Sequence, residues 1–304
     1  MEPCIWVDGV VSSASAAQVS ATDRGLLVGE GVFETCALIG GAPFALTRHL
    51  ARLRRSAEIV GLVLPWPDSL IRSACDDVIS TARVDEPSAL SGSEGDRAGL
   101  DVGGLDVGGK EPGARLRITV TGGSGPLGPD RGGAVPTLLV AIGPTPVRPA
   151  TARVVTGAWR LNEHSPTVGA KTTSYLEHLL ALAEAQRRGA DEAVLANTAG
   201  ALCEGTGSNV FVADGATLCT PSTSTGCLAG VTRALVCEEV DVVERDDLTL
   251  DHLRDASEAF LTSSTRGVHP ISSIDGQHRT GAPGPLTVAA AAALIAVHAR
   301  TNDP

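Results

Sequence analysis

The sequence is poor in lysine and in aromatic residues. Lys110 and Lys171 are the only lysines among its 304 residues, and Tyr175 is the only tyrosine. It also has no excess of positive charge, since the formal net charge is −11 and the isoelectric point is near 5.1. Nucleic acids and anionic membranes bind basic surfaces, so neither is expected as a partner. An anionic small molecule is compatible with this charge because individual arginines can bind it.

Long apolar runs, secretion signals and metal-ligand spacings are absent as well. The longest apolar run, at 288–297, is too short to cross a bilayer and predicts a packed terminal helix. The N-terminus has no basic segment followed by an apolar one, so no signal peptide is expected. The seven cysteines are scattered without a CxxC pair, which predicts reduced thiols in a cytoplasmic protein. The seven histidines form no ligand set, so we expect no metal.

The composition, 43% hydrophobic and 19% charged, is typical of a soluble globular protein. The length favours two domains and therefore a cleft between them. Strand and helix patterns that follow one another along the chain predict a mixed α/β fold of the α+β type. We expect a small N-terminal α/β domain over 1–143, a proline-rich linker over 144–149 and a larger C-terminal α/β domain over 150–304.

Hydrophobic periodicity predicts the main elements. In the first domain these are a hairpin at 5–11, helices at 44–61 and 67–82, and strands at 115–120 and 137–142. Thr47 is the expected N-cap of the first helix. In the second domain they are strands at 153–156, 193–197, 209–213 and 217–220, and helices at 174–188 and 230–239.

Residues 86–114 interrupt this pattern. The segment is rich in glycine and contains GLDVGG twice in tandem, with too little apolar material for a core. It predicts a flexible, solvated insertion that could be shortened without loss of stability or turnover. A lid over the cleft is the alternative, because the turn at 121–133 that we expect to face the substrate follows the strand after the insertion.

Two features in the second half are typical of a functional site. Glu204 is expected on a loop of small residues that leads directly into the strand at 209–213. Further on, Gly230 opens a helix whose free N–H groups, with the hydroxyl of Thr232, form an anion-binding site.

The spacing of these residues resembles the signature of the class IV aminotransferases, the fold-type-IV pyridoxal-phosphate enzymes. The matching elements are Glu204, Asn209-Val210-Phe211, Thr220 and Leu228-Ala229-Gly230-Val231-Thr232-Arg233. Further similar segments are Thr22-Asp23-Arg24-Gly25, Gly29-Glu30-Gly31-Val32-Phe33-Glu34, His49-Leu50-Ala51-Arg52-Leu53 and Gly169-Ala170-Lys171. The resemblance covers nearly the whole chain except 86–114. It implies a small and a large domain with the cofactor in the cleft between them.

The resemblance also implies the roles of the central residues. Lys171 would carry pyridoxal 5'-phosphate as a Schiff base, and a shielded amine beside a cationic ring can lose its proton readily enough for that role. The alternative is that Lys171 is a surface lysine before a helix, with no role in catalysis. Glu204 would face the pyridinium nitrogen and keep it protonated, which makes the ring an electron sink.

The remaining cofactor contacts are implied in the same way. Arg52 would bind the phosphate together with the amides of Val231 and Thr232 and the Thr232 hydroxyl. Ser264 would add a hydroxyl to the phosphate, or is a plain loop serine. Tyr175 is the candidate donor to the phenolic oxygen of the cofactor. The substrate carboxylates could be bound by Arg117, Arg131, Arg160 or Arg266, among which the sequence does not choose. The histidines, including His49 and His178, are expected to be structural or solvated.

The segments 171–176 and 262–270 look closer to 4-amino-4-deoxychorismate lyases than to the other members of the family. We therefore expect a lyase that eliminates pyruvate from a dicarboxylate substrate and gives 4-aminobenzoate for folate synthesis. An aminotransferase for branched-chain or D-amino acids is the alternative. A catalytically silent cofactor-binding protein is a remote one, since Lys171, Glu204 and Arg52 are all present. The resemblance also implies a homodimer.

Overall fold

The computed structural model describes residues 3–85, 101–102, 105–106 and 113–304. Most of the insertion at 86–114 therefore lies outside the described residues, and neither the flexible loop nor the lid is tested. The described part of it contains β5 (Asp101–Val102) and β6 (Leu105–Asp106), which pair in antiparallel fashion, and Ala114, which begins β7.

The first sheet contains strands from the N-terminal half of the chain, in the order β2-β1-β8-β7-β3-β4. Its strands are β1 (Cys4–Val7), β2 (Val10–Ser13), β3 (Gly31–Ile39), β4 (Ala42–Pro43), β7 (Ala114–Thr121) and β8 (Thr137–Pro144). Helices α2 (Leu46–Ile59) and α3 (Asp68–Asp85) pack on it around one core. Alternate residues of β7 point to opposite faces. Leu116 and Ile118 are fully buried in that core, so Arg115 and Arg117 lie on the other face.

The second sheet combines parallel and antiparallel pairs in the order β11-β10-β9-β16-β15-β12-β13-β14, with β17 beside β16. Its strands are β9 (Ala152–Leu161), β10 (Glu192–Asn197), β11 (Leu202–Gly205), β12 (Asn209–Asp214), β13 (Thr217–Pro221), β14 (Val242–Arg245), β15 (Ala259–Ser263), β16 (Gly267–Ile274) and β17 (Gln277–His278). The helices of this part are α4 (Leu176–Arg187), α5 (Val231–Glu239), α6 (Leu250–Asp255) and α7 (Pro285–Arg300). The predicted mixed α/β class is confirmed, and so is the packed terminal helix, which is α7.

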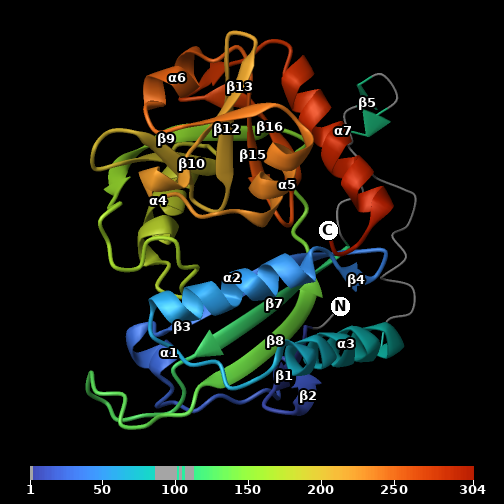
Figure 1. Ribbon diagram of the computed structural model, residues 1–304, viewed down its shortest axis with the longest axis vertical. Helices are drawn as coiled ribbons and strands as arrows, with labels where there is room; N and C mark the ends of the chain where they lie inside the picture. The colour runs from blue at the N-terminus through green and yellow to red at the C-terminus, as the bar shows by residue number, and fades with distance from the viewer. Residues whose placement is uncertain (1–2, 86–100, 103–104, 107–112) are drawn as a thin grey trace.

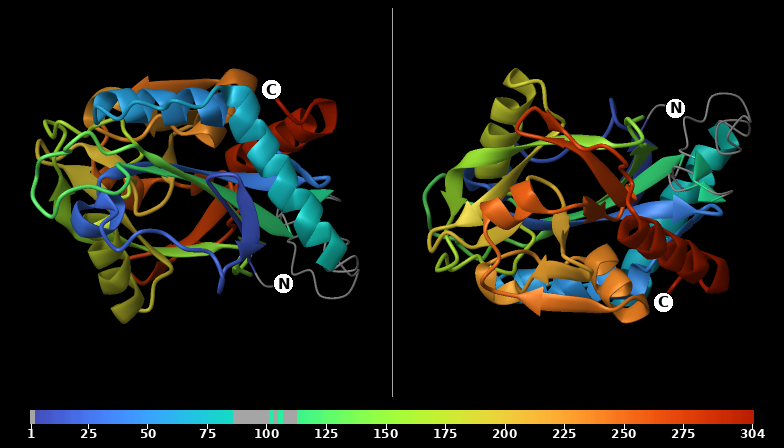
Figure 2. Two further views of the ribbon diagram at one scale, coloured as in Figure 1. Left: turned by 90° about the horizontal axis from the view of Figure 1, so that it is seen from below. Right: turned by 90° about the horizontal axis from the view of Figure 1, so that it is seen from above.

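The two sheets lie one above the other with α2 between them (Figure 1). Both views in Figure 2 place α2 beside the segment that contains α5 and β14. The contacts agree, since Arg48 of α2 pairs with Glu238 of α5 at 2.6 Å. The chain passes from the first sheet to the second between β8 and β9, within the expected linker region, and we propose the domain boundary there. Helix α2 is thus placed to contribute side chains to both parts.

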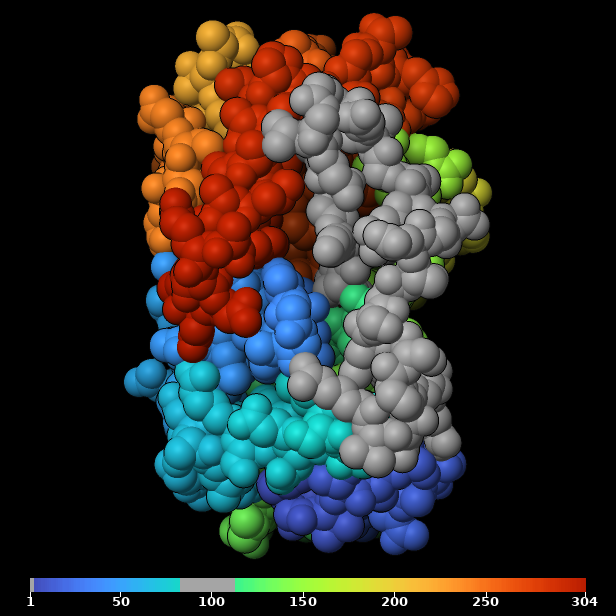
Figure 3. Space-filling model, turned by 90° about the vertical axis from the view of Figure 1, so that its right-hand side faces the viewer, coloured from blue at the N-terminus to red at the C-terminus, as the bar shows by residue number. Residues whose placement is uncertain are grey.

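The start of α2 differs from the expectation. Thr47 is not its N-cap: the helix begins at Leu46, and the cap position is Ala45, which has a left-handed conformation and no side-chain cap. The cap comes instead from the end of the chain. Asp303 accepts hydrogen bonds from the backbone N–H of Thr47 at 2.8 Å and from its hydroxyl at 2.6 Å. Figure 3 shows the C-terminal segment against the start of α2. A carboxylate here also faces the positive end of the helix dipole.

Replacing Asp303 with alanine is expected to lower the free energy of unfolding by about 1 kcal/mol, because it leaves the first turn of α2 without an acceptor. Urea unfolding followed by circular dichroism measures the change. Asp246→Ala, at an exposed position, is the control. An unchanged midpoint in the Asp303 variant would show that the contact contributes nothing to stability.

The described helices include none that is long and apolar enough to cross a membrane. The seven cysteines are all free thiols, and six of them are buried. The short helix α1 (Arg24–Val28) and the long strand β3 were not expected from periodicity. Both lie in or next to segments that were noted in the sequence only because they resemble segments of the class IV aminotransferases.

Candidate active site

A cavity of about 660 Å³ is lined by residues of both parts of the chain. Its wall includes Phe33 of β3, Arg52 of α2 and Arg117 of β7, and from the second part Lys171, Glu204 and Thr232. Tyr175, Val231 and Ser264 also line it. The structure therefore brings together all the residues expected to hold the cofactor.

The backbone of Lys171 is hydrogen-bonded to both α2 and β3. Its N–H donates to the Ser56 hydroxyl on α2 at 3.0 Å, and its carbonyl accepts from the Phe33 N–H at 2.9 Å. The Nζ atom lies 4.4 Å from the centroid of the Phe33 ring. Burial, followed by the positive charge of Arg52, lowers the pKa of the Lys171 amine to about 8. The amine can thus be neutral, and nucleophilic, close to neutral pH.

This pKa predicts how cofactor capture depends on pH. In the protein freed of cofactor, the rate of pyridoxal-phosphate capture should rise with pH through a midpoint near 8, because only the neutral amine of Lys171 attacks the aldehyde. An exposed lysine would give a midpoint near 10.5. Stopped-flow absorbance measures the rate. A midpoint at or above 10 would contradict the shielded amine.

Glu204 lies in strand β11 and not on a loop, which corrects the expectation; the loop is 206–208. One carboxylate oxygen accepts from the Leu228 N–H at 2.9 Å, just before α5. The other is 3.6 Å from Nε2 of His178. His178 in turn stacks on the Tyr175 ring, with centroids 4.5 Å apart. His178 was expected from the sequence to be structural or solvated; its position three residues after Tyr175 was the available signal that it lies at the cavity.

The loop at 206–208 is held by a buried ion pair between Glu192 and Arg266. Glu192 also accepts from the Gly207 N–H at 2.8 Å and the Ser208 hydroxyl at 2.7 Å. The Tyr175 hydroxyl donates to the Thr206 carbonyl at 3.0 Å. Arg266 is therefore engaged by protein groups, and its side chain supports the loop next to Glu204.

The start of helix α5, which also lines the cavity, supplies hydrogen-bond donors. Val231 and Thr232 begin α5, whose cap residue Gly230 makes no side-chain cap hydrogen bond. A side chain at position 230 would collide with Asn209, since a Cβ atom there would lie 1.9 Å from Oδ1. Asn209 itself donates to the Leu228 carbonyl at 2.8 Å, which fixes the approach to the helix. The motif residues Asn209 and Gly230 thus place a helix N-terminus on the cavity wall.

Arg52 lies beside this helix start. Its Nη1 donates to the Ala229 carbonyl at 2.9 Å, and its Nε and Nη2 donate to the two carboxylate oxygens of Glu34, each at 2.7 Å. The bidentate pair fixes the plane of the guanidinium. Glu34 was not recognised from the sequence as part of the site. The neighbouring arginines make surface pairs, Arg48 with Glu238 and Arg54 with Asp68.

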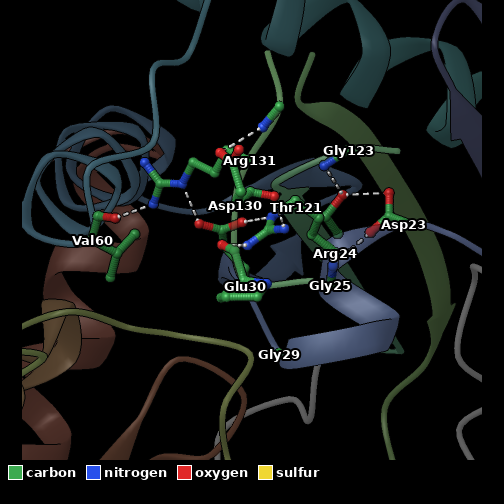
Figure 4. Close-up of polar contacts among 12 residues, drawn as sticks. Asp23, Arg24, Gly25, Gly29, Glu30, Val60, Thr121, Gly123, Asp130 and Arg131 are labelled. Atoms are coloured by element: carbon green, nitrogen blue, oxygen red, sulfur yellow. Dashed lines mark hydrogen bonds and ion pairs between the residues drawn. The ribbon is translucent and has the colours of Figure 1, made fainter. Parts of the chain in front are cut away.

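The four candidate substrate arginines differ in whether they line the cavity. Arg117 lines the cavity, with its guanidinium carbon 3.8 Å from the centroid of the Phe33 ring. Arg160 is not among the lining residues and donates to the Gly157 carbonyl. Arg131 points elsewhere: it pairs with Glu30 and donates to the Val60 and Gly61 carbonyls at the end of α2 (Figure 4).

Arg24 completes this cluster away from the cavity. It also pairs with Glu30 and donates to the Asp130 carbonyl, so it holds the turn that carries Arg131 (Figure 4). Arg131, Arg160 and Arg266 are thus not among the residues that line this cavity, and Arg266 pairs with Glu192. Arg115, which sequence reasoning missed, lines the cavity two residues before Arg117 on the same face of β7.

Pyridoxal phosphate fits these residues. The site offers a buried amine of lowered pKa, a carboxylate fixed by a backbone N–H, and a helix N-terminus with an adjacent arginine for a phosphate. Thr262 also lines the cavity, and its buried hydroxyl has no hydrogen-bond partner among the described residues. A ligand can supply one.

Comparison with known proteins agrees with this geometry. The family model for amino-transferase class IV matches residues 31–274. This chain belongs to the class IV aminotransferases. A putative branched-chain-amino-acid aminotransferase of Methanocaldococcus jannaschii is 30% identical over 282 residues, covering 90% of this chain and 88% of that protein. A D-alanine aminotransferase of Bacillus licheniformis is 29% identical over 291 residues, covering 93% of each chain. An aminodeoxychorismate lyase of Bacillus subtilis is 25% identical, covering 89% and 86%.

Solved structures of the class have the same fold. A fold IV-transaminase from Curtobacterium pusillum superposes with a TM-score of 0.74 at 30% identity and covers 96% of this chain and 91% of its own. A branched-chain aminotransferase from the thermophilic archaeon Thermoproteus uzoniensis, with norvaline, gives 0.77 at 26% identity and covers 97% and 94%. Another branched-chain amino acid aminotransferase of this fold was solved in complex with N-(5'-phosphopyridoxyl)-L-glutamate. Class IV aminotransferases use pyridoxal phosphate, and this chain is a pyridoxal-phosphate enzyme that acts on a small molecule. The aminotransferase alternative has more support among the relatives than the lyase first expected.

Proposed function

We propose that this enzyme is an aminotransferase for branched-chain or D-amino acids, with Arg117 binding the substrate carboxylate. The observation that carries the proposal is the position of Arg117. Its guanidinium and the Lys171 amine both lie against the Phe33 ring, at 3.8 and 4.4 Å from the centroid. Within the part of the chain that the structure describes, no carboxylate pairs with Arg117; its Nε donates to Thr119 at 3.2 Å. An amino acid held by Arg117 would lie in the same cavity as Lys171.

Each residue has a separate task in this proposal. Pyridoxal phosphate, when bound, supplies an electron-withdrawing ring that accepts the electron pair released at the α-carbon. Lys171 takes the α-proton and returns it. Glu204 holds a proton on the ring nitrogen, and Arg52 with the first N–H groups of α5 binds the phosphate.

The deciding experiment compares two reactions of the purified enzyme. Amino transfer to a 2-oxo acid is measured from a panel of L-branched-chain and D-amino acids, and pyruvate release is measured from 4-amino-4-deoxychorismate. We expect transfer from at least one amino acid to exceed pyruvate release. Pyruvate release without amino transfer would overturn the proposal in favour of the lyase.

Arg115 is the specific observation that keeps the lyase as a second candidate. Residues two apart on a strand are separated by about 7 Å, so Arg115 and Arg117 could bind the two carboxylates of one substrate. The aminodeoxychorismate lyase among the relatives is consistent with this.

Arg117→Gln is expected to raise KM for the amino acid by about 10- to 100-fold, because a charge-assisted hydrogen bond to the carboxylate is lost. The effect on kcat should be smaller. Steady-state kinetics measure both, with Arg160→Gln as the control outside the cavity wall. Equal KM values for Arg117→Gln and the unchanged enzyme would assign carboxylate binding to another residue.

We also propose a homodimer in the cytoplasm. Large apolar side chains are exposed on α1 and α4, among them Leu26, Val28, Leu176, Leu179 and Leu180, and Leu179 lies at the cavity wall. A second copy would cover them. Light scattering after gel filtration measures the mass in solution and so tests for a dimer.

The proposed location in the cytoplasm rests on the cysteines, because seven free thiols suit a reducing compartment.

A further inference from the structure

The side chain of Arg117 is held in a different way from that of Arg52. Arg52 is paired with the carboxylate of Glu34. The guanidinium of Arg117 lies instead over an aromatic ring, with its central carbon 3.8 Å from the centroid of Phe33. Within the described part of the chain, its hydrogen bonding is limited to the contact from Nε to the Thr119 hydroxyl. A ring and a hydroxyl therefore hold Arg117 in place of a carboxylate.

The pairing of two strands brings Phe33 and Arg117 together. In the antiparallel ladder of β3 and β7, Phe33 lies opposite Thr119, and Thr35 lies opposite Arg117. Phe33 and Arg117 are thus diagonal neighbours on one face of the sheet, at a separation that an aromatic and a long side chain can bridge. This face is turned to the cavity, since both residues line it. The contact is therefore fixed by the register of the two strands.

Phe33 is itself held on several sides. Its side chain is buried, and its backbone N–H donates to the Lys171 carbonyl at 2.9 Å. Its ring is nearly perpendicular to that of Tyr175, with centroids 5.8 Å apart, an arrangement that aromatic pairs favour. The Lys171 amine also lies against the ring, at 4.4 Å from the centroid. These contacts make the ring a rigid support for Arg117.

An aromatic ring can support a guanidinium without taking up its hydrogen-bond donors. The face of the ring attracts the cation, and the N–H groups around the guanidinium stay available to another partner. A carboxylate would accept those N–H groups and compensate the charge, as Glu34 does for Arg52. Burial lowers the pKa of Arg117, as expected for a cation without a carboxylate beside it, yet an arginine stays charged in a protein. Arg117 is therefore an oriented cation that can still bind an anion.

We propose that Phe33 is a positioning residue for the substrate, because its ring holds the guanidinium of Arg117 in the orientation that binds the carboxylate. The inference rests on the role proposed for Arg117 in the aminotransferase. Phe33 acts through Arg117 and does not itself bind the carboxylate. The affinity for a carboxylate should therefore depend on the ring at this position only while Arg117 is present.

The binding of simple carboxylic acids measures this role without turnover. Propanoate and 4-methylpentanoate carry a carboxylate but no amino group, so they bind to the cofactor-loaded enzyme without reacting, and isothermal titration gives their Kd. Phe33→Leu keeps an apolar side chain and removes the ring. We expect it to raise Kd by about 3- to 20-fold, which corresponds to the loss of one shielded cation–π contact.

Two further variants show whether the ring itself is responsible. Phe33→Tyr keeps the aromatic face, and it should bind the acids as the unchanged enzyme does. Phe44→Leu makes the same change as Phe33→Leu at a buried ring that does not line the cavity, and it should leave Kd unchanged. A raised Kd in Phe33→Tyr equal to that of Phe33→Leu would contradict the cation–π support.

A double-substitution cycle separates positioning from a direct contact with the ligand. In the Arg117→Gln background, Phe33→Leu should have no further effect on Kd, because the guanidinium on which the ring acts is gone. A ring that acted through Lys171 or Tyr175, or that only packed against the ligand, would raise Kd by the same factor in both backgrounds. That result would overturn the inference.

The outcomes decide separately on Phe33 and on Arg117. If Arg117→Gln leaves Kd unchanged, the proposed carboxylate site is wrong, and the inference is overturned with it. If Arg117→Gln raises Kd and Phe33→Leu does not, the inference alone is overturned. If Phe33→Leu does not fold, Phe33→pentafluorophenylalanine decides, since it keeps the shape of the ring and reverses the charge distribution on its face. This variant should also raise Kd, and an unchanged Kd would contradict the inference.

Discussion

Replacement of Lys171 by alanine is expected to reduce turnover by on the order of 10⁴-fold or more, because the amine is required both to bind the cofactor covalently and to move the substrate proton. Reduction of the loaded enzyme with borohydride should label the peptide that contains Lys171 and leave Lys110 unlabelled. The alanine variant should show no label. Steady-state assays and peptide mapping measure these two results.

The same substitution should not destabilise the fold at neutral pH. The pKa of Lys171 is lowered in the folded protein, to about 8 from an ordinary value near 10.5, so the unfolded chain binds this proton more tightly. The charged amine therefore favours unfolding below pH 8, and this cost disappears as pH rises towards 10.5. We expect the alanine variant to melt at the same or a higher temperature at pH 7. A lower melting temperature, or labelling at Lys110, would contradict the role of Lys171 as the shielded amine.

The residues assigned to the cofactor could be selected from the sequence, and found together in one cavity, because they occur in short segments whose spacing is itself the signal. Glu204, Asn209 and Gly230 are such a case, and the structure supplies the physical reason for two of them: Asn209 fills the space that a side chain at Gly230 would need. The secondary structure around Glu204 was wrong because the short strand β11 has no clear alternation.

What the sequence could not show are contacts between distant segments. Asp303 caps a helix 256 residues earlier, at Thr47, and no local pattern at either position indicates it. His49 and Glu34, 15 residues apart, meet only after β3 and α2 have packed. The sequence could not choose among the candidate substrate arginines for a similar reason. Arg131 and Arg266 are attractive as isolated charges, but their partners Glu30 and Glu192 lie 101 and 74 residues away.

Glu204→Gln is the second substitution with a large expected effect. The carboxylate is fixed by the Leu228 N–H at 2.9 Å, and an amide oxygen can accept the same hydrogen bond, so the fold and the shape of the site should be preserved. What is lost is the negative charge that holds a proton on the ring nitrogen. The loss of such a preorganised charge typically costs roughly 10²- to 10³-fold in kcat. Cofactor affinity should change much less, since the phosphate contacts are assigned to Arg52 and the start of α5 and not to Glu204.

Glu177→Gln is the matched control, because Glu177 also lines the cavity but is exposed on α4. Its kcat should change less than a few-fold. The kcat and the dissociation constant for pyridoxal phosphate are measured for both variants. Arg52→Ala should show the opposite balance, with weaker cofactor binding as its main effect, because Arg52 lies beside the helix start that is proposed to bind the phosphate. Near-normal turnover of Glu204→Gln would make Glu204 a structural residue of β11. A parallel loss of cofactor binding and turnover would mean that its charge holds the cofactor in place and is not specific to the reacting ring.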